Sequence, residues 1–220
     1  MEDWSKDILE SLANKEVTQD KELYNSKFFQ DHLKYRPIYN FIGDIIAAKF
    51  KPKSVIDWGC GCGFLLERLY GHGIENILGI EGSSDVIPIW QSELATGIAD
   101  HLVIADVTKP IEDVGVYELA ICMEVAEHIM ESKVGMLVSQ ICKSSSGLVW
   151  WTAAQPGQGG TGHITLKPTQ YWTDLFKEFD FEVDWEKTYE IKQIMLQNHA
   201  IALAYPWYRD NLVILRKNVL

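Results

Sequence analysis

Two carboxylates and two imidazoles are the side chains of this 220-residue chain best suited to moving a proton or holding a divalent ion. Glu124, Glu127 and His128 form an E-x-x-E-H group, and His163 follows in a glycine-rich stretch. Because imidazole exchanges a proton near neutral pH, we expect His163 to be a general base, with His128 second and Glu127 beside them. Carboxylate oxygens and imidazole nitrogens also suit Mg²⁺, Zn²⁺ or Mn²⁺. A structural alternative stays open, in which Glu124 closes a pocket while Glu127 and His128 cap the next helix.

A turn with three alternating glycines follows a short apolar segment. The stretch S-V-I-D-W-G-C-G-C-G-F contains Gly59, Gly61 and Gly63 and ends at Phe64. Glycine allows a positive φ and lets a ligand approach the main chain closely. The dinucleotide pattern G-x-G-x-x-G would require glycine where Phe64 stands, which disfavours a nicotinamide cofactor. The spacing predicts a ligand-binding turn between a strand and a helix.

The D-x-G-x-G-x-G pattern that begins at Asp57 resembles the first motif of class I S-adenosylmethionine (SAM)-dependent methyltransferases. In that family the turn receives the amino-acid end of SAM. The resemblance implies SAM as the cofactor and a cofactor-binding segment made of Asp57, Trp58, Gly59, Gly61, Gly63 and Phe64.

A second segment, E-L-A-I-C-M-E-V-A-E-H-I, resembles ubiquinone-biosynthesis O-methyltransferases and other small-molecule methyltransferases. This resemblance implies that Met123 and Glu124 line the cofactor. It also implies that Glu127 and His128 open the acceptor side of the site.

The E-x-x-E-H…H set is similar, in addition, to the divalent-ion site of RNA 3′-terminal 2′-O-methyltransferases, and some ubiquinone-type enzymes carry such a site. An ion held there acts as a Lewis acid on a substrate hydroxyl. Our leading assignment holds no metal, and the metal-dependent alternative uses Glu124, Glu127, His128 and His163. A net charge of −11 and only four arginines leave no basic stripe for phosphates, which argues against RNA.

Acidic residues stand at the ends of the expected strands. Ligands in open α/β sheets sit beyond the carboxyl ends of the strands, where we place Asp57, Glu81, Asp106 and Glu124. A carboxylate after the second strand accepts ribose hydroxyls, so Glu81 and the adjacent Gly82 are expected to hold the ribose. By the family resemblance, Asp106 with Val107 receives the adenine. Any one of these acids alone is typical of a solvated loop, but three in register with the turn favour a cofactor site.

Apolar runs alternating with helix-like segments predict an α/β fold. We expect a Rossmann-like, seven-stranded, mostly parallel sheet with helices on both faces and an antiparallel last strand. The expected strands lie near 54–57, 76–80, 101–105, 117–123, 147–153, 181–185 and 211–216. The expected helices include 64–70, 132–142, 168–176 and 189–197. We expect a single domain overall, with residues 1–50 as an N-terminal helical cap and residues 51–220 as the methyltransferase domain.

The stretch before His163 contains four glycines, Gly157, Gly159, Gly160 and Gly162. Such a main chain suits a flap that brings His163 to a reacting group and excludes water. The run P-G-Q-G-G-T-G-H followed by Y-W resembles a subgroup of small bacterial and phage-type methyltransferases. The alternative is a loose connection that leaves His163 on the surface.

These features predict transfer of a methyl group from SAM to an oxygen or nitrogen of a small organic acceptor, with no nucleic-acid partner. A non-catalytic SAM-binding protein is the alternative. No apolar stretch approaches the ~18 residues of a membrane helix. The polar amino terminus differs from an export signal, and four cysteines make no disulfide framework, so we expect a cytoplasmic protein that does not bind membranes. The amino-terminal region covers the pocket, forms a homodimer surface, or does both.

Overall fold

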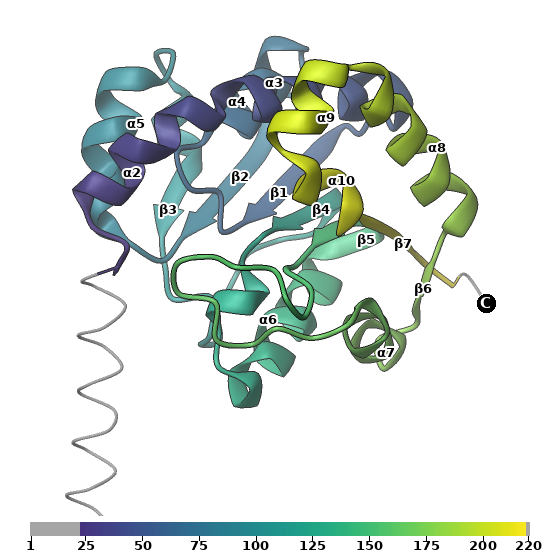
Figure 1. The fold of residues 1–220 in the computed structure, drawn as a ribbon. Helices are drawn as coiled ribbons and strands as arrows, with labels where there is room; N and C mark the ends of the chain where they lie inside the picture. The colour runs from purple at the N-terminus through teal and green to yellow at the C-terminus, as the bar shows by residue number, and fades with distance from the viewer. Residues whose placement is uncertain (1–22, 219–220) are drawn as a thin grey trace, which may run out of the picture.

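The computed structural model describes residues 23–218, which form one seven-stranded sheet covered by helices (Figure 1). The strands are β1 (Ser54–Trp58), β2 (Asn76–Glu81), β3 (Leu102–Ile104), β4 (Tyr117–Met123), β5 (Ser145–Thr152), β6 (Phe181–Val183) and β7 (Val213–Lys217). Their order is β3-β2-β1-β4-β5-β7-β6. The first five run parallel, and β7 is antiparallel to both β5 and β6. The predicted fold class is confirmed, including the antiparallel last strand.

The central strands are buried on both faces. All five residues of β1 and the last five of β4 are buried, as expected for the middle of a parallel sheet. Asp57 of β1 pairs with Gly79 of β2 and with Ile121 of β4. The carboxyl ends of β1, β2 and β4 therefore meet at one edge of the sheet.

Helices cover the two faces of the sheet (Figure 1). They are α2 (Ser26–His32), α3 (Arg36–Lys49), α4 (Phe64–Gly71), α5 (Ile87–Glu93), α6 (Glu131–Ser144), α7 (Thr169–Lys177), α8 (Trp185–Gln197), α9 (His199–Ala204) and α10 (Pro206–Asp210). Short 3₁₀ helices are η1 (Leu33–Tyr35), η2 (Ser84–Val86), η3 (Ile98–His101) and η4 (Ala126–His128). One apolar core joins the sheet to α3, α4, α5, α8 and α10, and a second joins it to α6 and α7.

The amino-terminal helices lie against the carboxyl-terminal helices. The hydroxyls of Tyr39 in α3 and Tyr208 in α10 are 2.9 Å apart, and the hydroxyl of Tyr205 donates to the carbonyl of Lys34 at 3.0 Å. The segments around α3 and α10, far apart in the sequence, therefore pack side by side (Figure 1). Residues 1–22 of the predicted cap lie outside the described residues. Within 23–218, no helix combines the length and apolar character needed to span a membrane.

The carboxyl-terminal third differs in detail from the expected elements. The sixth strand ends at Val183 because the Asp184 side chain caps α8, accepting the N–H of Lys187 at 2.8 Å. Two short helices, α9 and α10, were not predicted. Asn198 caps α9 by accepting the N–H of Ile201, and Pro206 occupies the first turn of α10. The last strand consequently begins at Val213 rather than at 211.

Candidate active site

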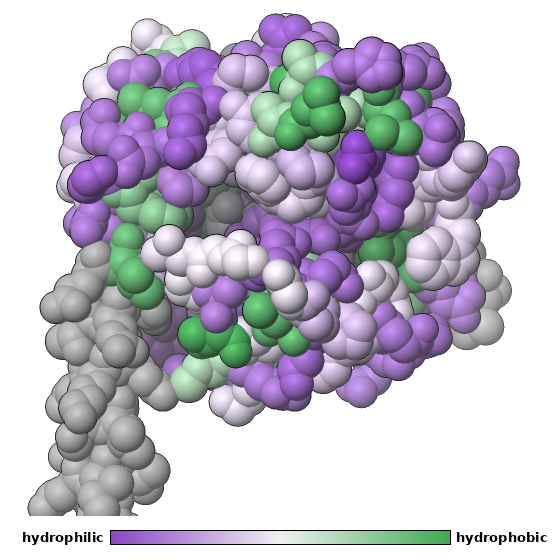
Figure 2. Space-filling model, in the orientation of Figure 1, coloured by the Kyte–Doolittle hydropathy of each residue, from purple (hydrophilic) through white to green (hydrophobic). Residues whose placement is uncertain are grey.

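The turn between β1 and α4 carries Gly59, Gly61 and Gly63 at φ +81°, +51° and +77°. A Cβ on Gly59 would collide with the side chain of Val125, so this glycine lets the turn pack against the chain that follows β4. A Cβ on Gly61, in contrast, would meet no atom within 4 Å. Gly61 therefore faces open space. The face of the molecule shown in Figure 2 has a hollow between α2 and α10.

Glu81, at the end of β2, holds the turn in place. Its two carboxylate oxygens accept the N–H groups of Gly61 and Ser83, each at 3.0 Å. Burial raises the pKa of Glu81, and the main-chain hydrogen bonds oppose that shift. A carboxylate oxygen has more than one lone pair, so both oxygens can still accept hydroxyl donors of a ligand.

Asp57, at the end of β1, is only 3% exposed, and no residue in 23–218 donates a hydrogen bond to its carboxylate. Burial, together with the nearby Glu81 carboxylate, raises the pKa of Asp57 to about 8. A buried acid of this kind favours a ligand that brings a positive charge or hydrogen-bond donors.

The other predicted cofactor residues are placed less directly. Asp106 accepts the N–H and the hydroxyl of Thr108 at 2.9 and 2.6 Å and pairs with Lys109 at 3.0 Å, so its own loop holds the carboxylate. Gly82 leaves open space where a Cβ would stand. Four further predicted cofactor residues have buried side chains that belong to the two apolar cores: Trp58, Phe64, Val107 and Met123.

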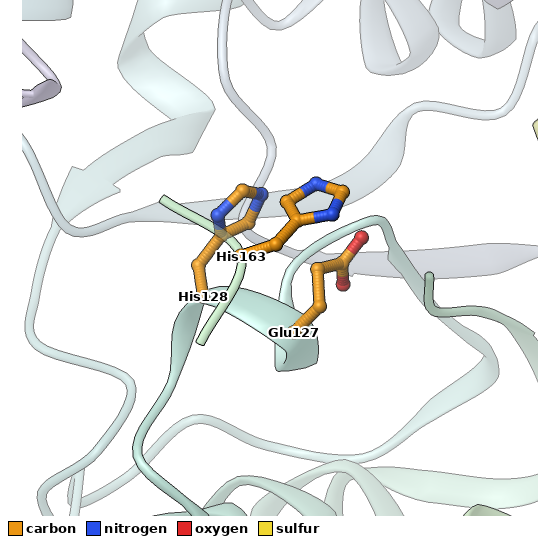
Figure 3. Close-up of side chains that lie close together, drawn as sticks. All are labelled: Glu127, His128 and His163. Carbon is orange, nitrogen blue, oxygen red and sulfur yellow. The ribbon is translucent and has the colours of Figure 1, made fainter. Parts of the chain in front are cut away.

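Glu127, His128 and His163 come together as the sequence predicts, with one potential metal-ligand atom of each lying within 4.8 Å of the others (Figure 3). We call these three residues the cluster. Glu127 and His128 belong to η4, just beyond β4. His163 arrives on the segment 155–163, here called the flap, and a Cβ on Gly160 would collide with its ring. The flap is tied to η4 because the N–H groups of Ile164 and Thr165 donate to the Glu127 carbonyl at 2.8 and 2.9 Å.

Hydrogen bonds fix the proton positions on both imidazoles. Nδ1 of His128 donates to the Gly162 carbonyl at 3.2 Å, and Nδ1 of His163 donates to the Gln158 carbonyl at 3.4 Å. The Nε2 atoms therefore keep their lone pairs when the rings are neutral. Burial lowers the pKa of His128 to about 4, so this ring is neutral at physiological pH.

The Glu127 carboxylate is the unusual member of the cluster. The side chain is completely buried, and neither oxygen has a hydrogen-bond partner among the described residues. Burial raises its pKa well above the usual range and the Glu124 carboxylate raises it further, while the nearby main-chain N–H groups of Glu127 and Ala154 oppose the shift without meeting the geometry of a hydrogen bond. Such a group needs a proton, an imidazolium or a metal ion as its partner.

Glu124, the fourth residue of the predicted metal-binding set, does not join Glu127, His128 and His163 in the cluster. Its carboxylate accepts the side-chain amides of Asn211 at 3.1 Å and Gln158 at 3.2 Å. The structure thus brings in two residues that sequence reasoning did not identify. Gln158 carried one signal, its position beside His163 in the flap, whereas nothing in the sequence singled out Asn211.

Tyr24 was also missed. Its ring lies edge-on to the ring of His128, with centroids 5.6 Å apart, and its carbonyl accepts the hydroxyl of Ser83 at 2.7 Å. Tyr24 therefore borders both the loop that follows Glu81 and the cluster.

Solved structures share this fold. A SAM-dependent methyltransferase from Archaeoglobus fulgidus matches 86% of this chain and 99% of its own, with a TM-score of 0.56 and 13% identity. Magnesium protoporphyrin IX methyltransferase (ChlM) from Synechocystis PCC 6803, with bound SAH (S-adenosylhomocysteine), matches 69% of this chain and 75% of its own, with a TM-score of 0.53 and 14% identity. The [4+2]-cyclase SpnF matches 82% and 81%, with a TM-score of 0.54 and 15% identity. No protein-family model and no curated protein matches the chain. The chain therefore has the fold of class I SAM-dependent methyltransferases.

Proposed function

We propose that this protein transfers a methyl group from SAM to an oxygen or nitrogen atom of a small organic acceptor. One observation carries the proposal: an open glycine turn and an imidazole–carboxylate cluster lie at the same edge of the sheet. The packing of Gly59 against Val125 joins the two, because Val125 is two residues before Glu127. A cofactor pocket and a proton-accepting site are thus adjacent.

The residues of the turn fit SAM. The open side of Gly61 leaves room for the ligand, and the unpaired Asp57 carboxylate suits an ammonium group. The remaining lone pairs of Glu81 suit the two ribose hydroxyls. SAM, when bound, supplies a methyl group on a positively charged sulfur. The protein's main task is then to hold the acceptor in line, an effect worth up to about 7–11 kcal/mol in favourable cases.

His163 is the proposed general base. Since its Nδ1 proton is donated to the Gln158 carbonyl, its Nε2 lone pair can take the proton of an acceptor hydroxyl or ammonium group. A positive charge on that ring lowers the pKa of the neighbouring Glu127 carboxyl group, so its carboxylate form is favoured only once the imidazolium has formed and would then stabilise it. The flap covers the cluster and limits access of water.

We propose that α2 and η1 provide the cover expected of the amino-terminal region. Tyr24 and α2 border the cluster, whereas α3 buries Ile38, Ile42 and Ile46 in the main core. The covering role would therefore belong to the chain before α3, and α3 would belong to the catalytic domain.

Alanine substitutions in the turn should separate ligand binding from folding. Gly61→Ala should weaken SAM binding by roughly tenfold or more, because the new methyl group enters the space left for the ligand. Its positive φ should lower the free energy of unfolding by only about 1–2 kcal/mol. Gly59→Ala should lower that free energy further, because it adds a collision with Val125. Calorimetric titration and urea unfolding measure the two effects.

The control for this pair is Gly159→Ala in the flap, where φ is not positive and the added Cβ meets nothing within 4 Å. It should change neither SAM affinity nor stability appreciably. Unaltered SAM affinity in Gly61→Ala would remove the turn from the binding site.

A metal-dependent form of the reaction is the second candidate, favoured by the buried Glu127 carboxyl group, which has no hydrogen-bond partner among residues 23–218 and lies beside two imidazoles. This mixed oxygen and nitrogen set fits Zn²⁺ or Mn²⁺ better than Mg²⁺. A bound ion would act as a Lewis acid on the acceptor oxygen. The net charge of −11 and the four arginines favour a small acceptor over RNA.

Zinc and manganese titrations decide between the two forms. If the cluster holds an ion, calorimetry should detect one site that His128→Ala abolishes. An ion at 100 times its dissociation constant should raise the free energy of unfolding by about 2.7 kcal/mol. Absence of binding, together with turnover that survives a chelator, would leave the metal-free form.

A further inference from the structure

Three side chains from distant parts of the sequence form a closed ring of hydrogen bonds beside the cluster. Nδ2 of Asn211 donates to Oε1 of Glu124 at 3.1 Å and to Oε1 of Gln158 at 3.0 Å. Nε2 of Gln158 donates to Oε2 of Glu124 at 3.2 Å. Both Asn211 protons and both Glu124 oxygens are used, so the ring fixes the orientation of each amide. We call these three residues the latch.

The latch connects three elements that otherwise stand apart. Glu124 follows β4, Gln158 lies in the middle of the flap, and Asn211 lies between α10 and β7. Asn211 is 3% exposed, so the carboxyl-terminal part of the latch is buried in the protein. The flap is thereby attached to the core at a point between its two ends.

The main chain of Glu124 is held in a strained conformation that serves this arrangement. Its φ is +53°, which is unfavourable for a residue with a Cβ. Its N–H donates to both the carbonyl and the hydroxyl of Thr152, at 3.1 and 3.0 Å. Strain of this kind persists where the surroundings determine it strongly, and it directs the Glu124 carboxylate to the two amides.

Gln158 also contacts the proposed base. While its side chain belongs to the latch, its carbonyl accepts the Nδ1 proton of His163. The position of that carbonyl sets which nitrogen of His163 is free. Through the Gln158 carbonyl, the latch is therefore in direct contact with the ring of His163, the proposed base.

We propose that Gln158 and Asn211 are positioning residues, which bind Glu124 in order to hold the flap closed and to keep the Gln158 carbonyl against Nδ1 of His163. This role rests on the proposed function for its catalytic meaning. The closure itself can be tested without any turnover.

Hydrogen–deuterium exchange of the full chain tests the closure. Gln158→Glu replaces the amide donor by a carboxylate opposite Glu124, so the flap should open. Exchange at the amides of Ile164 and Thr165 should then rise roughly ten- to a hundredfold, while the strands keep their protection. Thr161→Ala is the matched control, because Thr161 is exposed in the same flap and makes no hydrogen bond with a described residue.

Exchanging the carboxylate and the amide between positions 124 and 158 should restore the latch. In the double variant Glu124→Gln with Gln158→Glu, the amide at 124 can donate to the carboxylate at 158, and Asn211 keeps an acceptor on each side. Protection of Ile164 and Thr165 should return to within about threefold of the wild type. An unchanged exchange rate in Gln158→Glu overturns the latch, and so does a double variant that stays as open as the single one.

The His163 ring gives a second readout. At a pH where the ring is neutral, its nitrogen resonances should report the Nδ1–H tautomer in the wild type and in Thr161→Ala, but a mixture of tautomers in Gln158→Glu. In turnover, Gln158→Glu should lower kcat roughly tenfold or more while SAM affinity changes less than about threefold. A protein that closes its flap but binds no SAM would refute the proposed function and leave the latch standing.

Discussion

Replacing His163 by alanine is expected to lower the turnover number by about 10²- to 10⁴-fold, the range typical of losing a general base. SAM affinity should stay within about threefold, because the ring lies with Glu127 and His128 and not at the glycine turn. The measurement is the rate of SAH formation with whichever member of a panel of hydroxyl and amine compounds serves as acceptor. Calorimetry reports the SAM affinity.

His199→Ala is the control for this variant, because His199 is exposed at the start of α9. It should behave like the wild type in both assays. Wild-type turnover in His163→Ala would remove the base role. If turnover falls instead, chelator treatment of the wild type distinguishes a proton acceptor from a metal ligand, since only the ligand role makes turnover sensitive to the chelator.

Replacing Glu127 by glutamine should stabilise the metal-free protein at neutral pH while lowering its turnover. The pKa of Glu127 is raised in the folded state by burial and by Glu124. Between the unfolded pKa, about 4.3, and the folded one, the folded protein holds a proton that the unfolded chain has lost. The contribution of this group to stability therefore falls as pH rises, by up to about 1.4 kcal/mol per pH unit.

Glutamine keeps the shape of the neutral acid and does not ionise, so the fall should disappear. Urea unfolding in the presence of a chelator, from about pH 5 to pH 8, should give a flatter curve for Glu127→Gln than for the wild type. Asp57, with a pKa of about 8, adds a similar slope to both proteins and cancels in the comparison. Parallel curves would show that Glu127 is not a buried neutral acid.

The sequence was a good guide to the inner strands. The segments expected near 54–57, 76–80 and 117–123 coincide with β1, β2 and β4 to within one residue. β1 and most of β4 are buried on both faces, so their apolar pattern has hardly any alternative. The short helices α9 and α10 were missed because each of them buries only one residue. Their signals were Asn198 as a cap and Pro206 in a first turn.

For the candidate site, the sequence predicted the residue types better than their partners. Glu127, His128 and His163 do lie together, since two share η4 and the flap supplies the third. Glu124 instead binds two amides, and that pairing depends on Asn211, which follows a helix that was not predicted. Trp58 and Phe64 stand beside the glycines in sequence, and their side chains are buried in the two apolar cores, one in each. The cytoplasmic location and the homodimer stay predictions.

A fold of this class does not by itself establish methyl transfer, because the [4+2]-cyclase SpnF shares it. Calorimetric titration of the wild-type chain with SAM and with SAH addresses the central claim most directly. We predict saturable binding of one molecule per chain, weakened strongly by Asp57→Asn and by Glu81→Ala. If neither compound binds at millimolar concentration, the glycine turn and its carboxylates do not form a SAM site, and the proposed function is wrong.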